Sequence, residues 1–347
     1  MPASRQQRKF LLISGSPSHC HRQALEQVDK SALWIGWKAP HPFQAFEPGR
    51  LEQKLGSEVE QLVFDALEGF DPNAFAMALG LVRGGGRFLL LTPPLSDWPS
   101  LPDRELARLA VAGWHQVGSS LFLERFAALL MEQPTPTSTA SDGQSGTWEA
   151  LTKDQARALE RLEHLARGHP HRPVMITADR GRGKSALFGI FAARLLTEGR
   201  RHILVTAPRQ SATRILFRHA LENLPGARQR QGRVETDGRR LEFMAPDALI
   251  EKKPAAELLL IDEAAGIPLP LLEKLILVWP RVALASTVHG YEGSGRGFLL
   301  KLGRWMDELR PQWHHIHLQE PVRWASGDRL EAFGRRLLLL DAEPEKI

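Results

Sequence analysis

The chain contains 347 residues, of which 43% are hydrophobic and 24% charged, a composition that fits two globular domains and excludes a fibrous or disordered protein. The formal net charge is +5, so any nucleic-acid binding would depend on local clusters of basic side chains and not on the field of the whole molecule. The sequence has no apolar run of about 18 residues and no stretch near its start that resembles a signal peptide, so we expect a cytoplasmic protein that does not bind a membrane.

The first part of the chain alternates short apolar runs with a helical pattern. Four runs are typical of buried strands: residues 9–15, 32–37, 62–66 and 87–94. Residues 71–86 predict a helix that begins at an aspartate and stops at the glycines 84–86, which we expect to connect the helix to the next strand. This alternation is typical of an α/β domain with a mostly parallel sheet and helices on its faces. The single cysteine, Cys20, excludes an internal disulfide.

Residues 132–147 separate two halves of the chain. This stretch is rich in Pro, Ser, Thr and Gly and nearly devoid of large apolar residues, so it cannot bury enough surface to become ordered by itself. We therefore expect an N-terminal domain over residues 1–131, a linker over 132–147 and a second domain over 148–347.

The second half alternates helices and strands regularly. Helical patterns cover residues 151–168, 184–199, 209–224 and 268–279. Apolar runs typical of strands cover residues 173–178, 202–208, 257–265 and 281–288. Between them, Asp237 and Gly238 separate two alternating runs and predict a hairpin. The pattern indicates the α/β core of a P-loop NTPase, in which a parallel sheet carries the nucleotide at its edge.

The segment "VMITADRGRGKSALFGIFAARLL" has the strand, glycine-rich turn and helix of a phosphate-binding loop, although Ala178 replaces the usual first glycine. Backbone N–H groups around Gly181 and Gly183 can point at phosphate, Lys184 can reach the terminal phosphates, and the Ser185 hydroxyl can bind magnesium. If the backbone at Ala178 is extended, this position does not need the conformational freedom that glycine would provide. We expect the first turns of the following helix, residues 186–190, to lie beneath the sugar and the base.

A second acidic motif supports nucleotide hydrolysis. The apolar run in "LLLIDEAA" ends at Asp262 and Glu263. The first carboxylate is suited to hold Mg²⁺ through water, and the second to orient or deprotonate the attacking water. Because adjacent side chains on a strand point to opposite faces, a sharp turn must bring both to one site. The sequence therefore predicts an ATPase or GTPase.

Three stretches occur in the order of helicase motifs Ia, II and III: residues 205–212, 262–265 and 286–298. In this arrangement Ser286 and Thr287 would sense the γ-phosphate. Gln155, just upstream of the loop, is placed where helicases often recognise adenine by paired hydrogen bonds.

Four segments closely resemble the tRNA(Met) cytidine acetyltransferase family: "TADRGRGKSAL", "LLIDEAAGIPLPLL", "TVHGYEGSGRGFLLK" and "EPVRWASGDRLE". The resemblance covers essentially the whole chain and implies a Rossmann-like N-terminal domain followed by a RecA-like, RNA-helicase-type ATPase module. Members of that family also lack the first loop glycine, which accounts for Ala178. The implied ligands are ATP, or GTP, with Mg²⁺ at Ser185 and Asp262.

The resemblance also implies which residues bind the nucleotide. Arg323 would neutralise the γ-phosphate with its planar guanidinium and would act with Lys184, Asp262 and Glu263 in hydrolysis. The implied nucleotide contacts are Gln155, Gly181, Arg182, Gly183, Lys184, Ser185, Ala186, Leu187, Phe188, Gly189, Ile190 and Arg323.

Family members continue into an acetyl-CoA-binding acetyltransferase domain and a tRNA-binding region, and we find no segment here that resembles either. We therefore expect acetyl transfer, and any use of acetyl-CoA, to require a domain supplied separately or downstream. The implied partner is tRNA, specifically elongator tRNA(Met). Two functions remain open: an RNA-dependent ATPase motor that remodels tRNA, and a nucleotide-switched module that binds RNA or a partner with little motor activity.

Several other residues stand out. His314, His315 and His317 lie in an apparent strand that would send His315 and His317 to one face, with no third ligand nearby in sequence, so we do not expect zinc. Trp324 and Tyr291 are candidates for base stacking.

Overall fold

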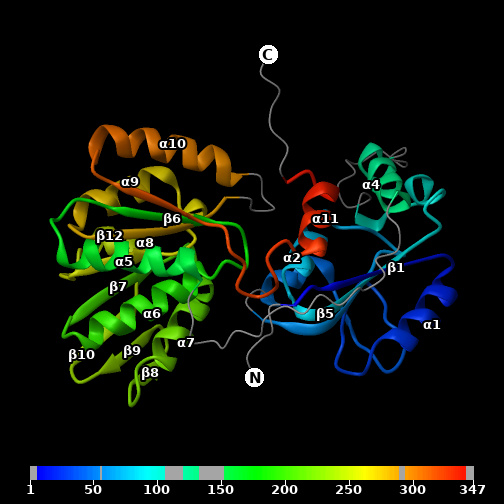
Figure 1. The fold of residues 1–347 in the computed structure, drawn as a ribbon, viewed down its shortest axis with the longest axis horizontal. Coiled ribbons are helices and arrows are strands. Elements are labelled where there is room, and N and C mark those ends of the chain that lie inside the picture. Colours follow the sequence, from blue (N-terminus) through cyan, green and yellow to red (C-terminus); the bar gives the residue numbers. More distant parts are fainter. Residues whose placement is uncertain (1–5, 55–56, 106–119, 133–151, 289–293, 341–347) are drawn as a thin grey trace. The chain divides into compact units, whose positions relative to one another are not determined.

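The computed structural model describes residues 6–54, 57–105, 120–132, 152–288 and 294–340. Contacts divide the chain into two units (Figure 1): the first comprises Met1–Trp148 with Arg323–Ile347, and the second comprises Glu149–Val322. Most of the expected linker lies outside the described residues. In the part of the chain that the structure describes, no helix is both long and apolar enough to cross a membrane.

The first unit is built on one parallel sheet. Its strands follow the order β1-β5-β4-β2-β3, and every neighbouring pair is parallel. The strand bounds are β1 Lys9–Ser14, β2 Leu33–Ile35, β3 Ala45–Phe46, β4 Val59–Asp65 and β5 Val82–Thr92. The predicted α/β class with a parallel sheet is therefore confirmed.

Successive strand residues point to opposite faces of this sheet. Apolar side chains therefore lie on both faces, and helices cover each of them. Val63 and Leu89 pack with Cys20 on the face that carries α1, whereas Phe64 and Phe88 belong to the larger core on the other face. The helices of this unit are α1 Pro17–Gln27, α2 Pro72–Leu79, α4 Leu121–Met131 and α11 Arg329–Leu337, with 3₁₀ turns at η1 Pro48–Lys54 and η2 Trp98–Ser100.

The glycine triplet 84–86 corrects one expectation. Helix α2 begins after Asp71, whose side chain accepts hydrogen bonds from the N–H groups of Asn73 and Ala74, but it ends at Leu79. The triplet lies inside β5 and not between helix and strand. Gly85 has a φ of 78°, and the pairing of β4 with β5 shifts register nearby. The glycines thus form an irregularity within a strand, as glycine commonly does.

The end of the chain groups differently from the expected division, which assigned residues 148–347 to one module. Contacts place Arg323–Ile347 in the first unit. Helix α11 lies against α2 (Figure 1), where Leu330 and Leu337 enter the core and Gly334 packs against Leu79. Burial of this apolar face accounts for the grouping.

The second unit has a larger mixed sheet with the order β13-β6-β12-β11-β7-β10-β9-β8. Strands β13 to β10 are parallel, and β9 and β8 add antiparallel strands at one edge. Asp237 and Gly238 form the predicted hairpin turn, with φ of 46° and 75°. The bounds are β6 Val174–Ala178, β7 His202–Thr206, β8 Arg228–Arg230, β9 Arg233–Thr236, β10 Arg239–Phe243, β11 Leu258–Ile261, β12 Val282–Thr287 and β13 His314–Leu318.

This sheet also lies between two helical layers, which completes the predicted RecA-like core. Helices α5, α6 and α7 pack on one face, and α8, α9 and α10 pack on the other. Their bounds are α5 Lys153–Arg167, α6 Lys184–Thr197, α7 Arg214–Glu222, α8 Pro246–Lys252, α9 Leu269–Val278 and α10 Ser294–Leu309, with 3₁₀ turns at η3 Gln210–Thr213 and η4 Ala264–Gly266.

Candidate nucleotide-binding site

The glycine-rich loop follows β6 at the carboxyl edge of the parallel sheet, where such sheets bind ligands. Gly181 and Gly183 have φ of 77° and 78°, which glycine adopts without steric cost. Gly183 directly precedes α6, and no side chain caps the start of this helix. The loop thus presents a helix N-terminus, a favourable environment for phosphate.

Ala178 is the last residue of β6 and is fully buried. It lies in register with Thr287 of β12 and Leu318 of β13. Its carbonyl oxygen accepts from the backbone N–H of Val288 at 3.1 Å. Because Ala178 belongs to a paired strand, its position does not need the conformational freedom of glycine.

Gln155 supports the loop from α5. Its side-chain oxygen accepts from the N–H of Thr152 at 3.1 Å, and its amide nitrogen donates to the carbonyl of Arg182 at 3.4 Å. Only 3% of Gln155 is exposed, and a Cβ at Gly183 would overlap its amide nitrogen. Adenine recognition by Gln155 stays a prediction, and it would require these hydrogen bonds to be released.

Lys184 lies at the centre of a polar chain. Its Nζ donates to Thr287 Oγ1 at 3.0 Å, and the Thr287 hydroxyl donates to Glu263 Oε2 at 3.2 Å. Burial lowers the pKa of Lys184, while the charges of Glu263 and Asp262 oppose that change. The lysine, hydroxyl and carboxylate come from α6, β12 and the end of β11 respectively.

Asp262 and Glu263 are brought together by the predicted sharp turn. Glu263 adopts a left-handed conformation with φ of 47° and ψ of 50°. Asp262 is fully buried. Burial, and then the charge of Glu263, raise the pKa of Asp262 to about 7, while Ser185 and Lys184 lower it.

The donor set fits a magnesium nucleotide. Among the described residues, Asp262 Oδ2 is buried without a hydrogen-bond partner, although its other oxygen accepts from the N–H of Glu263 at 3.0 Å. Carboxylate and hydroxyl oxygens are the ligands that Mg²⁺ prefers. Asp262 and Ser185 could therefore hold Mg²⁺ beside phosphates bound by the loop and Lys184.

The predicted contacts on the rest of α6 differ in accessibility. Ala186 and Ile190, one turn apart, are half-buried. Leu187 and Phe188 are fully buried in the core, and Gly189 packs so closely on α7 that a Cβ would overlap the carbonyl oxygen of Leu216. The side chains at positions 187 and 188 therefore offer no surface to a nucleotide. Arg182, in the loop, is 6% exposed.

Arg323 belongs to the first unit. Its Nε lies 3.2 Å from Glu58 Oε1, and its Nη1 donates to the carbonyl of Gly80 at 3.0 Å. The role of Arg323 at the γ-phosphate stays a prediction. Trp324 is only 3% exposed, with the Arg8 guanidinium 3.7 Å from its ring centroid. Such burial contradicts the base-stacking hypothesis for Trp324, and Tyr291 lies outside the described residues.

The histidines of β13 are arranged as the alternation predicts. His315 Nε2 and His317 Nδ1 lie 2.7 and 3.0 Å from the hydroxyl of Thr177, so both point to the same face. Burial, and the neighbouring His317, lower the pKa of His315. Over the described ranges, no group of three or more His, Cys, Asp or Glu side chains could hold a metal ion.

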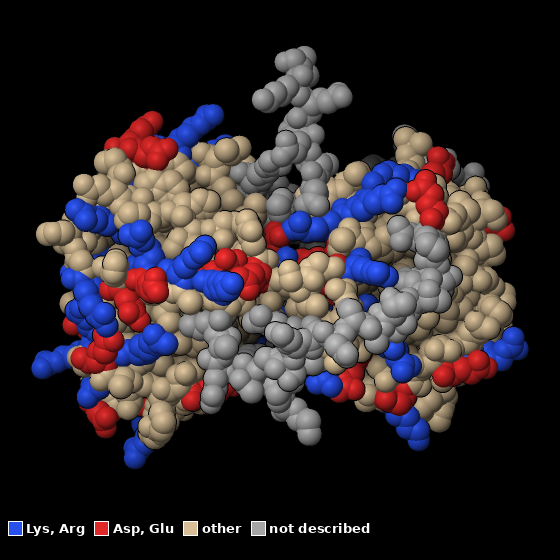
Figure 2. Space-filling model, in the orientation of Figure 1, with Lys and Arg blue, Asp and Glu red and all other residues tan. Residues whose placement is uncertain are grey.

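Basic side chains alternate with acidic ones on the face of the molecule that Figure 2 shows. Arg167 pairs with Glu198 at 2.7 Å, and Arg233 pairs with Glu235 at 3.0 Å. Neighbouring acidic side chains therefore partly neutralise both arginines.

Two residues that help to hold the glycine-rich loop in place were not predicted from the sequence. Val322 donates its N–H to the carbonyl of Gly181 at 3.1 Å, a contact with no signature in the sequence. Thr152 forms a capping box with Gln155. The spacing of Thr152 and Gln155 matches the known capping-box pattern and could have identified this pair.

Two family models match the chain. Residues 175–341 match "RNA cytidine acetyltransferase NAT10/TcmA, helicase domain", and residues 2–137 match "tRNA(Met) cytidine acetyltransferase TmcA, N-terminal".

Curated relatives also belong to this family. A tRNA(Met) cytidine acetyltransferase of Nitrosococcus halophilus is 42% identical over 360 residues, covering 96% of this chain and 48% of the relative. One from Vibrio cholerae is 38% identical, covering 84% of this chain and 39% of the relative. The chain spans about half the length, or less, of these relatives.

Similarity to solved structures is weak. The large terminase of a thermophilic bacteriophage is 12% identical with a TM-score of 0.37, covering 48% of this chain and 45% of that chain. This likeness adds nothing to the assignment, which depends on the sequence relatives.

Proposed function

The chain belongs to the tRNA(Met) cytidine acetyltransferase family, and from this premise we propose that it is the ATP-hydrolysing, RNA-helicase-type part of an enzyme that acetylates N4 of the wobble cytidine in elongator tRNA(Met). ATP hydrolysis would remodel the tRNA so that the cytidine reaches an acetyltransferase domain. That domain, which would bind acetyl-CoA, would be supplied downstream or by a separate chain. We place this activity in the cytoplasm, where tRNA is modified.

The observation that carries the proposal is the chain of hydrogen bonds from Lys184 through Thr287 to Glu263. It joins the phosphate-binding lysine to the carboxylate best placed to activate water, at one edge of a parallel sheet. Few structural roles need a buried lysine beside two acidic side chains, because burying charge is costly unless a ligand or partner compensates it.

Each of these side chains has a distinct task in hydrolysis. The loop N–H groups and Lys184 bind the terminal phosphates and neutralise charge that develops on them. Glu263 orients a water molecule and accepts its proton. Mg²⁺, held by Ser185 and Asp262, would supply further charge neutralisation at the phosphates. Arg323 would contribute a second cation at the γ-phosphate.

A steady-state ATPase assay with and without elongator tRNA(Met) tests the proposal. We expect tRNA to raise the rate, Glu263→Gln to reduce turnover at least a hundredfold with ATP still bound, and Lys184→Ala to abolish ATP binding without unfolding the protein. Lys252→Ala, an exposed lysine on α8, is the matched control.

The alternative function is a nucleotide-driven switch that binds RNA or a partner without turnover. An unchanged rate with tRNA, together with full function of Glu263→Gln, would favour that switch over the motor. Retention of ATP affinity in Lys184→Ala would contradict the whole site.

A further inference from the structure

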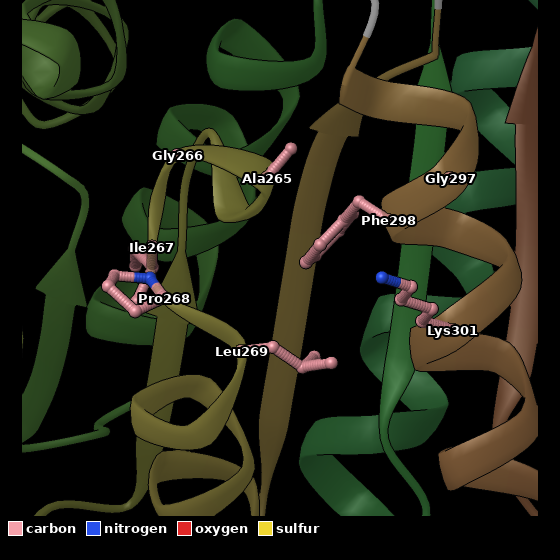
Figure 3. Close-up of a pocket in the computed structure, with 8 residues that line it drawn as sticks. All are labelled: Ala265, Gly266, Ile267, Pro268, Leu269, Gly297, Phe298 and Lys301. Carbon is pink, nitrogen blue, oxygen red and sulfur yellow. The ribbon is translucent and has the colours of Figure 1, made fainter.

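A groove lies beside the carboxylates of the nucleotide site, between the turn that follows Glu263 and helix α10. Its volume is about 560 Å³, within the range of small-ligand sites. Figure 3 shows Phe298 and Lys301 extending from α10 toward the opposite wall, from which Leu269 extends. The lining consists of Ala265, Gly266, Ile267, Pro268, Leu269, Gly297, Phe298 and Lys301.

The described lining has a distinctive chemistry. Phe298 supplies one aromatic ring, and Lys301 supplies the one charge, which is positive. The two residues are three apart on α10, so they lie on the same side of the helix. Lys301 is exposed, and no acidic residue is among the described lining residues. Pro268 and Leu269 add apolar surface opposite the ring.

Single-stranded nucleic acid matches the ring, the apolar surface and the cation of the described lining. Bases of single-stranded nucleic acid stack on aromatic side chains, and the phosphate between nucleotides is attracted to lysine. Gly266 and Gly297 have no side chain to obstruct a nucleotide's approach, and a Cβ at Gly297 would meet nothing within 4 Å.

We propose that this groove binds one nucleotide of single-stranded RNA, with its base on Phe298 and its phosphate at Lys301. The proposal deepens the proposed function, on which it rests, because it names the surface through which RNA would act on the ATPase. An apolar peptide segment would match the ring of Phe298 and the apolar surface of Leu269, but it would make no use of the positive charge of Lys301.

The groove is connected through the backbone to Glu263, the proposed hydrolytic carboxylate. Its lining begins at Ala265, two residues after Glu263, and the N–H of Gly266 donates to the carbonyl of Glu263 at 3.0 Å. Gly266 also lies so near Pro208 that a Cβ would come within 2.5 Å of the proline ring. A nucleotide bound against this turn would therefore lie next to the backbone that positions Glu263.

The test measures binding of a fluorescent 12-nucleotide polyuridine to the full chain by anisotropy. Phe298→Ala and Lys301→Ala should each weaken binding about tenfold, and Lys301→Ala should also lower the salt-dependence slope by about one. Because Phe298 contacts the core, Phe298→Leu provides a second variant that keeps apolar bulk but lacks the ring. Lys274→Ala, an exposed lysine on α9 outside the lining, is the control and should change neither RNA binding nor ATPase activity.

The outcomes separate this inference from the proposed function. If RNA stimulates the ATPase but Phe298→Ala, Phe298→Leu and Lys301→Ala bind polyuridine as tightly as Lys274→Ala, the groove does not bind RNA and the inference is overturned. If polyuridine binding depends on Phe298 and Lys301 but no RNA raises the ATPase rate, the inference stands and the motor function fails.

Discussion

At the scale of single residues, the hydroxyl of Thr287 joins Lys184, the proposed phosphate-binding lysine, to Glu263, the proposed hydrolytic carboxylate. Thr287→Val keeps the shape of the side chain but removes both hydrogen bonds, so the orientation of Glu263 and Lys184 is lost. We expect kcat for ATP to fall at least tenfold while KM changes less, because the interaction positions reacting groups. Steady-state kinetics measure both constants.

Ser286 is the control for Thr287. Among the described residues its hydroxyl has no hydrogen-bond partner, and as its neighbour on β12 it points to the opposite face. The sequence predicted that both Ser286 and Thr287 sense the γ-phosphate, whereas the structure links only Thr287 to Lys184. A larger loss of kcat in Ser286→Ala than in Thr287→Val would contradict this distinction.

Cys20 gives a pH-dependent prediction in the other unit. Burial, and then the charge of Asp65, raise the pKa of its thiol to about 11, above the usual value of about 8.5. A raised pKa in the folded state stabilises the fold below the unfolded pKa, and that contribution is lost as pH rises toward 11. The unfolding free energy of the native chain relative to Cys20→Ala should therefore fall by about 1–2 kcal/mol between pH 7.5 and pH 10.

Urea denaturation of both proteins at the two pH values measures this difference. Taking the difference cancels other groups that titrate in both proteins. If the difference in unfolding free energy between Cys20→Ala and the native chain does not change with pH, the thiol titrates normally in the folded state.

The sequence predicted which residues gather around the glycine-rich loop, but it did not predict the hydrogen bonds between them. The spacing of Gly183, Lys184 and Ser185 specifies a phosphate loop wherever a strand precedes it and a helix follows. In contrast, the hydrogen bonds of Thr287 and Gln155 depend on side-chain directions that the linear pattern does not contain. The burial of Phe188 likewise follows from which side of α6 faces the sheet.

At the scale of elements, the packing of α6 on α7 depends on Gly189. A Cβ there would lie 2.9 Å from His219 Cβ and overlap the carbonyl of Leu216, so the two helices would have to separate. We expect Gly189→Ala to lower the unfolding free energy by about 1–3 kcal/mol. Urea denaturation monitored by circular dichroism provides the measurement.

Gly303→Ala on α10 is the matched control. A Cβ at Gly303 would meet nothing within 4 Å, so the substitution should stabilise the protein by about 0.5–1 kcal/mol through its helix preference alone. Equal effects of the two substitutions would mean that close packing on α7 is not what requires glycine at position 189.

Most helices and strands of the second unit were predicted because apolar periodicity and turn residues agree there. The glycine triplet 84–86 misled the prediction for a physical reason. Consecutive glycines usually mark a connection, but here the neighbouring strands continue to pair on either side of an irregular strand segment. Only the partner strand reveals that difference.

At the scale of the whole molecule, the grouping of Arg323–Ile347 with the N-terminal sheet could not be predicted from sequence. Its partners lie far away along the chain, and no local pattern records such a contact. Arg8 and Asp328 illustrate this: they are 320 residues apart, and their side chains meet at 2.7 Å with almost no exposure. Asp328 also accepts from the N–H of Glu331 at 2.8 Å and so caps α11.

Because this ion pair joins both ends of one unit, its loss should weaken that unit selectively. Asp328→Ala leaves the Arg8 charge buried without its carboxylate and removes the cap of α11, which together should cost about 3–5 kcal/mol. We expect hydrogen exchange measured by mass spectrometry to accelerate in β1, β5 and α2 while β6 and α6 keep their protection. Asp247 is exposed on α8, and Asp247→Ala should change the hydrogen exchange of neither group of elements. Faster exchange in β6 and α6 instead would mean that the end of the chain stabilises the second unit, as the domain boundary predicted from the sequence at residue 148 implies.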